Sequence, residues 1–175
     1  MLGKGKSLLR RTLHWQVVVG SICCLLLVSL IVVGCGGGGG GTPSIPSGTF
    51  TAKIDGKVFN ARLAYFTLNE DHVVVMGFTN DGRGIEIDFD IPSSLPKTYI
   101  LASEDADGFV TIMPNVNDPN TWEEYFALDN SGTVTITALT ANNCQGTFSF
   151  KAKDEDTGKV ITVTDGKFNV PKSPD

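Results

Sequence analysis

Few side chains in this sequence could carry out covalent chemistry. His72 is the one histidine after position 34, and it stands at the head of the apolar run Val73-Val74-Val75. A serine hydrolase would need such a histidine beside a nucleophile, and a Gly-x-Ser-x-Gly nucleophile elbow occurs nowhere in the chain. We therefore expect His72 to lie at the edge of a strand, and we expect the protein not to be an enzyme.

Acidic clusters could bind a hard cation such as calcium. The segment Ser103–Gly108 (SEDADG) places side-chain oxygens at alternate positions before a glycine, which makes Asp105 and Asp107 the candidate ligands. The twelfth position of such a loop would be Pro114, where a bidentate glutamate is needed. A solvated acidic hairpin is the favoured interpretation, here and for Asp154–Gly158 (DEDTG), so no metal or other cofactor is expected.

Pairs of carboxylates could also hydrolyse glycosides. Asp88 and Asp90 are two residues apart, so they project from one side of a predicted strand. Glycoside hydrolysis needs two differently tuned carboxyl groups about 5–9 Å apart in a cleft. The sequence indicates no cleft around this pair.

Aromatic side chains could stack on sugar rings if several shared one exposed face, and the candidates are Trp122, Tyr125, Tyr65 and Tyr99. If residues 121 to 128 form a strand, Trp122 and Phe126 point one way and Tyr125 the other. The aromatic side chains would then lie on both faces of the strand and could not form one sugar-binding surface. Packing in the core is therefore favoured for Trp122 over sugar binding.

Cys144 is the one cysteine after Cys35. In an oxidising compartment it would have no partner for an intramolecular disulfide. A buried free thiol is the favoured interpretation, and an intermolecular disulfide is the alternative.

The elements that must position these residues are short strands. From Thr49 onward, alternating apolar runs are separated by glycine turns at Asp55-Gly56, Asp81-Gly82, Asp107-Gly108 and Asp165-Gly166, which supply the positive φ of tight hairpins. In Ile85–Ile91 (IEIDFDI) the apolar residues should face the core and the carboxylates water, and Phe148 and Phe150 should likewise face the core. The pattern predicts an all-β domain, either an antiparallel β-sandwich or a small barrel.

The first 34 residues are typical of an export signal. Lys4, Lys6, Arg10 and Arg11 precede an apolar run from Val17 to Val33. Val32-Val33-Gly34-Cys35 follows and resembles the lipobox of bacterial lipoproteins, whereas Cys23 and Cys24 lie inside the apolar run. The resemblance implies that the Cys35 thiol is lipidated and that the chain is cut between Gly34 and Cys35. An uncleaved signal anchor is the alternative.

A tether follows the predicted lipid anchor. Gly36 to Gly41 is a run of six glycines, and Thr42–Ser47 is a short Pro/Ser spacer, so this stretch behaves as a linker. The expected organisation is a signal peptide (1–34), a lipidated cysteine and tether (35–48), a β domain (49–171) and a tail (172–175). Gly36 rather than Asp after Cys35 favours the outer over the inner membrane of the cell envelope.

The charge of the exported part excludes some partners. Four of the 14 basic residues precede position 35, which leaves 10 against 19 acidic residues and a formal charge of −9. Such a domain repels nucleic acid and anionic lipid headgroups. The expected partners are the lipid bilayer, through acylated Cys35, and an envelope protein or glycan.

Three segments carry a family resemblance: Phe50–Lys57 (FTAKIDGK), Gly146–Phe150 (GTFSF) and Ile161–Phe168 (ITVTDGKF). They resemble small bacterial lipoproteins of unknown function that have a lipobox, a low-complexity tether and one β domain. The resemblance covers about Phe50 to Val170 and implies the fold and the lipid anchor, but no catalytic residue. Many of these relatives have an apolar residue before Gly-Thr-Phe, where this chain has Asn143-Cys144-Gln145.

Together these features predict a membrane-anchored, non-enzymatic binding or structural accessory module of the cell envelope. Two alternatives remain: a lipocalin-like barrel that carries a small apolar ligand, and a hydrolase. Aromatic side chains lining a cavity would favour the carrier, and an aromatic or apolar surface patch would favour the binding module.

Overall fold

The structure is a computed structural model that describes residues 48–112 and 122–174. Contacts between residues separate Ser44–Asp175 from Met1–Pro43 as a compact unit. The predicted signal peptide, the cleavage site at Gly34 and Cys35, and the glycine run lie outside the described residues. Among the residues that are described, no helix is long and apolar enough to span a membrane.

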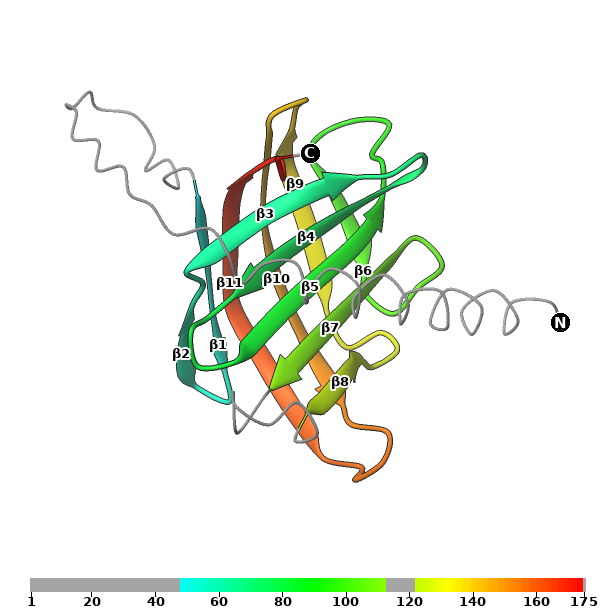
Figure 1. The fold of residues 1–175 in the computed structure, drawn as a ribbon. Helices are drawn as coiled ribbons and strands as arrows, with labels where there is room; N and C mark the ends of the chain where they lie inside the picture. Colours follow the sequence, from blue (N-terminus) through cyan, green and yellow to red (C-terminus); the bar gives the residue numbers. More distant parts are fainter. Residues whose placement is uncertain (1–47, 113–121, 175) are drawn as a thin grey trace, which may run out of the picture. The chain divides into compact units, whose positions relative to one another are not determined.

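The described residues form eleven strands and no helix (Figure 1), which confirms the all-β prediction. The strands are β1 (Thr49–Ile54), β2 (Lys57–Asn60), β3 (Leu63–Leu68), β4 (His72–Phe78), β5 (Arg83–Asp90), β6 (Lys97–Ile100), β7 (Ala106–Ile112), β8 (Glu123–Ala127), β9 (Thr133–Leu139), β10 (Asn143–Lys153) and β11 (Val160–Pro171). All eleven belong to one antiparallel sheet that curls into a half-barrel. The barrel alternative therefore describes the fold better than two stacked sheets.

The sheet runs in the order β2-β1-β11-β10-β8-β7-β5-β4-β3. β10 has two neighbours on one side: Cys144–Ser149 pairs with β9, which in turn pairs with β6, and Ala152–Lys153 pairs with β8. At the far end of this order, β3 returns to the end of β11. There Phe66 forms a parallel bridge with Lys172, and its carbonyl accepts a hydrogen bond from the Ser173 N–H at 2.8 Å. β3 and the end of β11 are thus in direct contact.

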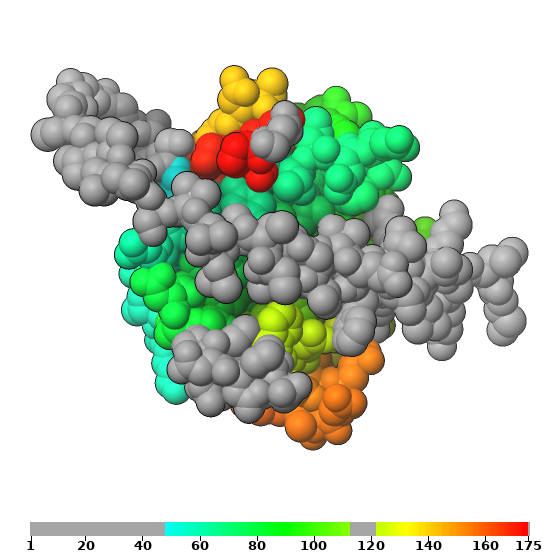
Figure 2. Space-filling view, in the orientation of Figure 1, coloured from blue at the N-terminus to red at the C-terminus, as the bar shows by residue number. Residues whose placement is uncertain are grey.

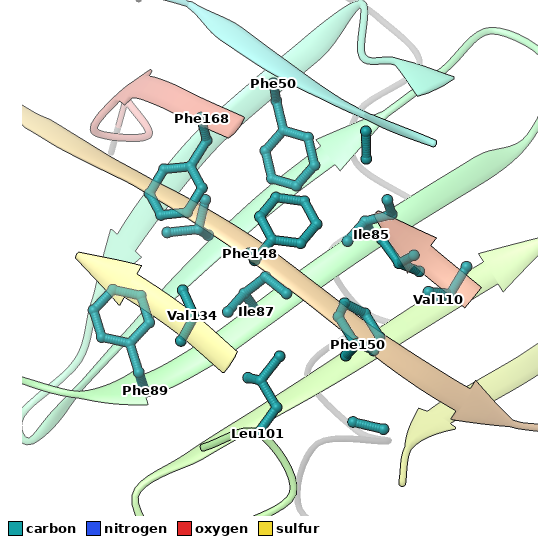
Figure 3. Packing of buried hydrophobic residues seen from close by; sticks show 14 of the residues in the cluster. Phe50, Ile85, Ile87, Phe89, Leu101, Val110, Val134, Phe148, Phe150 and Phe168 are labelled. Atoms are coloured by element: carbon teal, nitrogen blue, oxygen red, sulfur yellow. The ribbon is translucent and has the colours of Figure 1, made fainter. Parts of the chain in front are cut away.

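Phenylalanine rings fill the concave side of the sheet (Figure 3). Phe50 lies 5.3 Å from Phe148 and 6.1 Å from Phe168, centroid to centroid, and all three are buried. Phe150 packs beside Phe148, as the alternation in this segment predicts. The core is thus built from side chains on alternate positions of every long strand.

The strand β5 follows its predicted alternation only in part. Ile85, Ile87 and Phe89 are buried in the core as expected. Two expectations for this segment were wrong: Ile91 lies beyond the end of β5 and is 43% exposed, and the carboxylates do not face water. Glu86 and Asp88 are only 6% and 8% exposed, and they lie on the outward face beside a second hydrophobic cluster.

Two of the Asp-Gly pairs lie in hairpin turns as predicted, and one of them is Asp81-Gly82 between β4 and β5, where Gly82 has a φ of 78°. Asp55 and Gly56 connect β1 to β2, with φ values of 48° and 76°. This positive φ at both residues is typical of a two-residue hairpin loop.

Two other Asp-Gly pairs do not form turns, contrary to prediction. Asp165 has a φ of 54° but sits in a bulge, because β11 continues past it and pairs with both β1 and β10. Asp107 and Gly108 lie inside β7. A Cβ at Gly108 would lie 3.2 Å from the ring of Phe150, so this glycine makes room for a core side chain rather than for a turn.

Candidate functional site

His72 begins β4, which confirms its prediction as a strand-edge residue. Its Nδ1 lies 2.7 Å from Asp71 Oδ1, and its Nε2 lies 2.9 Å from Asn69 Nδ2. Because an amide nitrogen only donates, Nε2 accepts this bond and Nδ1–H donates to the carboxylate. Both ring nitrogens are therefore engaged within the β3–β4 hairpin, and the arrangement stabilises the turn.

The candidate calcium ligands do not share a loop. Asp105 is exposed in the turn before β7, whereas Asp107 lies inside β7 directly opposite Asp88 of β5. Asp107 Oδ1 accepts the Gly108 N–H at 2.8 Å. Within the described ranges, no three His, Cys, Asp or Glu side chains are grouped so as to hold a metal ion.

The second acidic cluster is a capped turn. Asp154 Oδ1 accepts the N–H groups of Asp156 at 2.9 Å and Thr157 at 2.7 Å. These bonds, that of Thr157 above all, lower the pKa of the Asp154 carboxyl. The carboxylate of Asp154 is thus committed to the turn between β10 and β11.

The predicted aromatic residues do not form a common platform. Tyr65, Tyr99 and Tyr125 are all buried, and the Tyr99 hydroxyl donates to the Asp90 carbonyl at 2.6 Å. Residues 123–127 form a strand, so Tyr125 points into the core and Phe126 away from it, as predicted. Trp122 precedes this strand and is half-buried outside the core cluster.

A polar group that the sequence did not reveal lies at the start of β8. Tyr125 Oη donates to Glu123 Oε2 at 2.5 Å, and Lys159 Nζ donates to the same oxygen at 3.1 Å. Lys159 also lies 5.5 Å from the centroid of the Tyr125 ring. Figure 2 shows β8 (yellow-green) beside the β10–β11 turn (orange) on one surface. The sequence carries no signal for this group, because Glu123 and Lys159 are far apart in the chain and only the pairing of the strands brings them together.

The electrostatics of this group favour a structural role. Burial and the bond to Glu123 raise the pKa of Tyr125, and the bonds to Tyr125 and Glu123 raise the pKa of Lys159. The bond from Tyr125, followed by that from Lys159, lowers the pKa of Glu123. At neutral pH the phenol therefore stays protonated and the amine stays charged, so neither is an activated nucleophile.

Cys144 is a buried free thiol, as predicted. Burial raises its pKa to about 12, because the thiolate would lose its hydration in the core. A thiol in this state does not act as a nucleophile or metal ligand.

The outward face of β3, β4, β5, β7 and β8 carries the most distinctive arrangement of side chains. One row of directly paired residues crosses all five strands: Tyr65 pairs with Met76, Met76 with Glu86, Glu86 with Phe109, and Phe109 with Phe126. Each of these residues has a neighbour along its strand in the core cluster: Phe66, Val75, Ile85, Val110 and Tyr125. The row therefore lies on the side of the sheet that points away from the core.

The flanking rows of this outward face add further carboxylates. On one side Val74 pairs with Asp88, and Asp88 pairs with Asp107. On the other side Thr111 pairs with Glu124. The outward face thus holds an apolar and aromatic row between carboxylates.

The outward face also differs from a water-facing sheet in its composition. It has a hydrophobic cluster of its own, separate from the core: Tyr65, Val74 and Met76, with Phe78 packed against them. The rings of Phe109 and Phe126 lie 5.0 Å apart, and both are half-buried. An antiparallel sheet face that meets water is expected to be polar. The composition of this face differs from that of a water-facing sheet, so it is the candidate binding surface.

Comparison with known proteins identifies the domain but not its activity. No curated protein and no solved structure matches the chain. One family model, described as a domain of unknown function (DUF6252), matches residues 46–171, which include all eleven strands. The chain therefore belongs to the DUF6252 family of domains of unknown function.

Proposed function

We propose that this protein is a lipid-anchored lipoprotein of the cell envelope whose β domain is a non-enzymatic binding module. The observation that carries the proposal is the row Tyr65–Met76–Glu86–Phe109–Phe126 on the outward face. Phe109 and Phe126 of this row are partly exposed, and apolar side chains gathered on the surface of a folded domain are typical of interaction sites.

The anchoring part of the proposal rests on the sequence. Val32-Val33-Gly34-Cys35 gives the order of residues that lipidation and cleavage require, and a flexible glycine run follows. A tether from Gly36 to Gly48 spans about 20 Å as a flexible coil. Such a length would let the domain reach a partner near the membrane, with the outer membrane favoured by Gly36.

The carrier alternative is less well supported. A lipocalin-like carrier needs an internal cavity, and the concave side of this half-barrel is occupied by packed rings of Phe50, Phe148 and Phe168 (Figure 3). Aromatic side chains are instead available on the outward face, at Phe109 and Phe126. The binding module is therefore the function that the geometry favours.

A capture experiment tests the binding function. Full-length protein is crosslinked in cells and recovered from envelope extracts, in parallel with Phe126→Ser and Val58→Ser. Val58 is 59% exposed on β2 and lies outside the outward face, so it is the matched control for removing a surface apolar side chain. A specific partner should be recovered with the wild type and Val58→Ser and lost with Phe126→Ser. Equal recovery with all three would refute binding through this face.

Mass spectrometry tests the anchor separately. The mature N-terminus should be Cys35 carrying a diacylglyceryl group. An intact chain that still begins at Met1, with an unmodified Cys35, would refute the lipoprotein assignment.

A further inference from the structure

Three exposed aliphatic side chains lie at one end of the half-barrel. Leu68 is the last residue of β3, Ile91 directly follows β5, and Leu95 lies in the connection from β5 to β6. They are 47%, 43% and 40% exposed. Leu68 pairs with Val73 at the start of β4, and on the other side of β4 the Ile91 N–H donates to the Asp71 carbonyl at 3.1 Å. We name these three exposed side chains the apolar tip.

The chain enters the domain at this same end. β1 begins at Thr49 beside the last part of β11, and Lys172, just after β11, bridges to Phe66 near the end of β3. Figure 1 shows the start of β1, the β3–β4 turn and the β5–β6 connection at the upper end of the half-barrel. A tether of the length and composition of Gly36 to Gly48 spans about 20 Å. A lipid anchor before this tether would therefore hold the apolar tip close to a bilayer.

Hydrogen bonds fix the loops that carry the apolar tip. The Asp90 N–H donates to the Asp105 carbonyl at 2.8 Å, and the Asp90 carbonyl accepts a bond from the Tyr99 hydroxyl at 2.6 Å. In the neighbouring turn the Asn69 N–H donates to the His72 carbonyl at 2.9 Å. Because the backbone is already held in place, little conformational entropy is lost when the tip meets another surface.

Charge at this end decides which lipid surface the tip can meet. Among the described residues, carboxylates here outnumber the lysines Lys97 and Lys172, and they are Glu70, Asp71, Asp90, Glu104 and Asp105. Anionic headgroups are repelled by this excess, as they are by the formal charge of −9 of the sequence after position 34. Zwitterionic headgroups carry no net charge, so they leave contact with the apolar tip unopposed.

We propose that Leu68, Ile91 and Leu95 insert into the headgroup region of a zwitterionic phospholipid bilayer, the same bilayer that holds the anchor. This inference rests on the proposed lipid anchor and goes beyond the proposed binding function, because it gives the domain a second contact with the membrane. Three aliphatic side chains bind a bilayer weakly by themselves, but a tether keeps their effective concentration high. Docking by this end leaves the outward face on the side of the half-barrel accessible to a partner.

Fluorescence quenching tests the inference on the full-length lipoprotein, reconstituted through its own anchor into phosphatidylcholine vesicles. An environment-sensitive dye is attached to a Leu68→Cys variant, and the buried Cys144 stays unlabelled. The matched control is Val160→Cys, which replaces a side chain that is 48% exposed at the start of β11, at the opposite end of the half-barrel. The quencher is a phospholipid that carries a nitroxide at the level of the headgroup. Wild-type protein taken through the same labelling gives the background from the other cysteines.

The dye on Leu68→Cys should be quenched several-fold more strongly than the dye on Val160→Cys, because quenching requires contact with the headgroup region. Adding Ile91→Ser and Leu95→Ser to the Leu68→Cys variant should reduce its quenching towards that of the control. Replacing part of the phosphatidylcholine by anionic phosphatidylglycerol should reduce it as well. Far-UV circular dichroism verifies that each variant is folded, and the comparison of Leu68→Cys with Val160→Cys stands even if the triple variant unfolds.

Equal quenching of the two dyes on vesicle-bound protein would overturn the inference, and so would stronger quenching in anionic vesicles. Self-association that Ile91→Ser/Leu95→Ser abolishes would also overturn it, since the tip would then pair with a second copy. Equal quenching on protein whose Cys35 carries lipid refutes the tip and leaves the anchor standing. Protein that does not float with the vesicles and has an unmodified Cys35 refutes both. The crosslinking result with Phe126→Ser remains an independent measure of binding by the outward face.

Discussion

Phe148 of β10 lies directly over Gly166 of β11, and one step along the same strand pair Phe168 lies over Gly146. Each phenylalanine thus packs on the bare backbone of the opposite strand. The two motifs Gly146-Thr147-Phe148 and Gly166-Lys167-Phe168 are therefore one reciprocal structure.

Replacing Gly166 by alanine should destabilise the domain. A Cβ at this position would lie 2.6 Å from the Phe148 ring and 2.5 Å from the Phe148 carbonyl oxygen, and the latter is backbone that cannot move aside easily. Overpacking of this kind costs about 1–3 kcal/mol. Urea unfolding followed by circular dichroism measures the loss, and Thr147→Ala, an exposed position in the same motif, should change stability little. Equal stability of Gly166→Ala and the wild type would contradict this packing.

The pairing of these two motifs could be predicted from the sequence only in part. Alternation correctly placed Phe148 and Phe150 in the core, because period-two burial is a local property. The same Asp-Gly chemistry forms a turn at Asp55 and a bulge at Asp165. The difference is set by β1 and β10, which pair with β11 on both sides of the bulge and are far away in sequence.

Neutralising Asp81 should reduce the acid sensitivity of the domain. Arg83 holds Asp81 with its Nε 3.1 Å from both carboxylate oxygens, and its Nη1 donates to the Val58 carbonyl on β2 at 3.1 Å. The bond to Arg83, with that to Thr79, lowers the pKa of the Asp81 carboxyl below its usual value of 3.8. A lowered pKa in the folded state means that the stabilisation is present above about pH 4 and is lost as the pH falls through the folded pKa.

The size of this effect is limited by solvent, since the Asp81 side chain is 61% exposed. A surface pair contributes less than about 1 kcal/mol. Unfolding free energies measured from pH 7 down to pH 2.5 should show the wild type above Asp81→Asn at neutral pH and the two converging in acid. A constant difference over this range would show that the Asp81 charge does not contribute.

The candidate binding surface was harder to predict than the core. The strands that carry Tyr65, Met76 and Phe109 were recognised, but their alignment in one row depends on the register of four strand pairs. The carboxylates Glu86 and Asp88 were expected to face water because the alternation assigned them to the non-core side. That side is correct, but Glu86 and Asp88 are only 6% and 8% exposed on it, beside a second hydrophobic cluster.

The fragment Gly48–Asp175 should fold on its own without lipid, metal or disulfide. It contains every described strand and the whole core cluster, and its single cysteine, Cys144, is a free thiol. Far-UV circular dichroism should show a cooperative thermal transition that EDTA and reductant leave unchanged. A transition lost on adding EDTA would point to a structural cation, for which Asp105 and Asp107 would be the first residues to replace.

Cys144 should be inert in the folded fragment. Its side chain is fully buried between the neighbouring strands, where it is opposite Leu139 on β9 and Val170 on β11, and burial raises its pKa to about 12. At neutral pH it is therefore a protonated thiol that a reagent reaches only when the sheet opens. A chromogenic disulfide reagent should label the native fragment slowly and the urea-unfolded fragment at once. Cys144→Ala should cost about 1–2 kcal/mol in stability through lost packing. Rapid native labelling, or a dimer on non-reducing gels that disappears in Cys144→Ala, would show the thiol to be accessible and would favour the intermolecular disulfide.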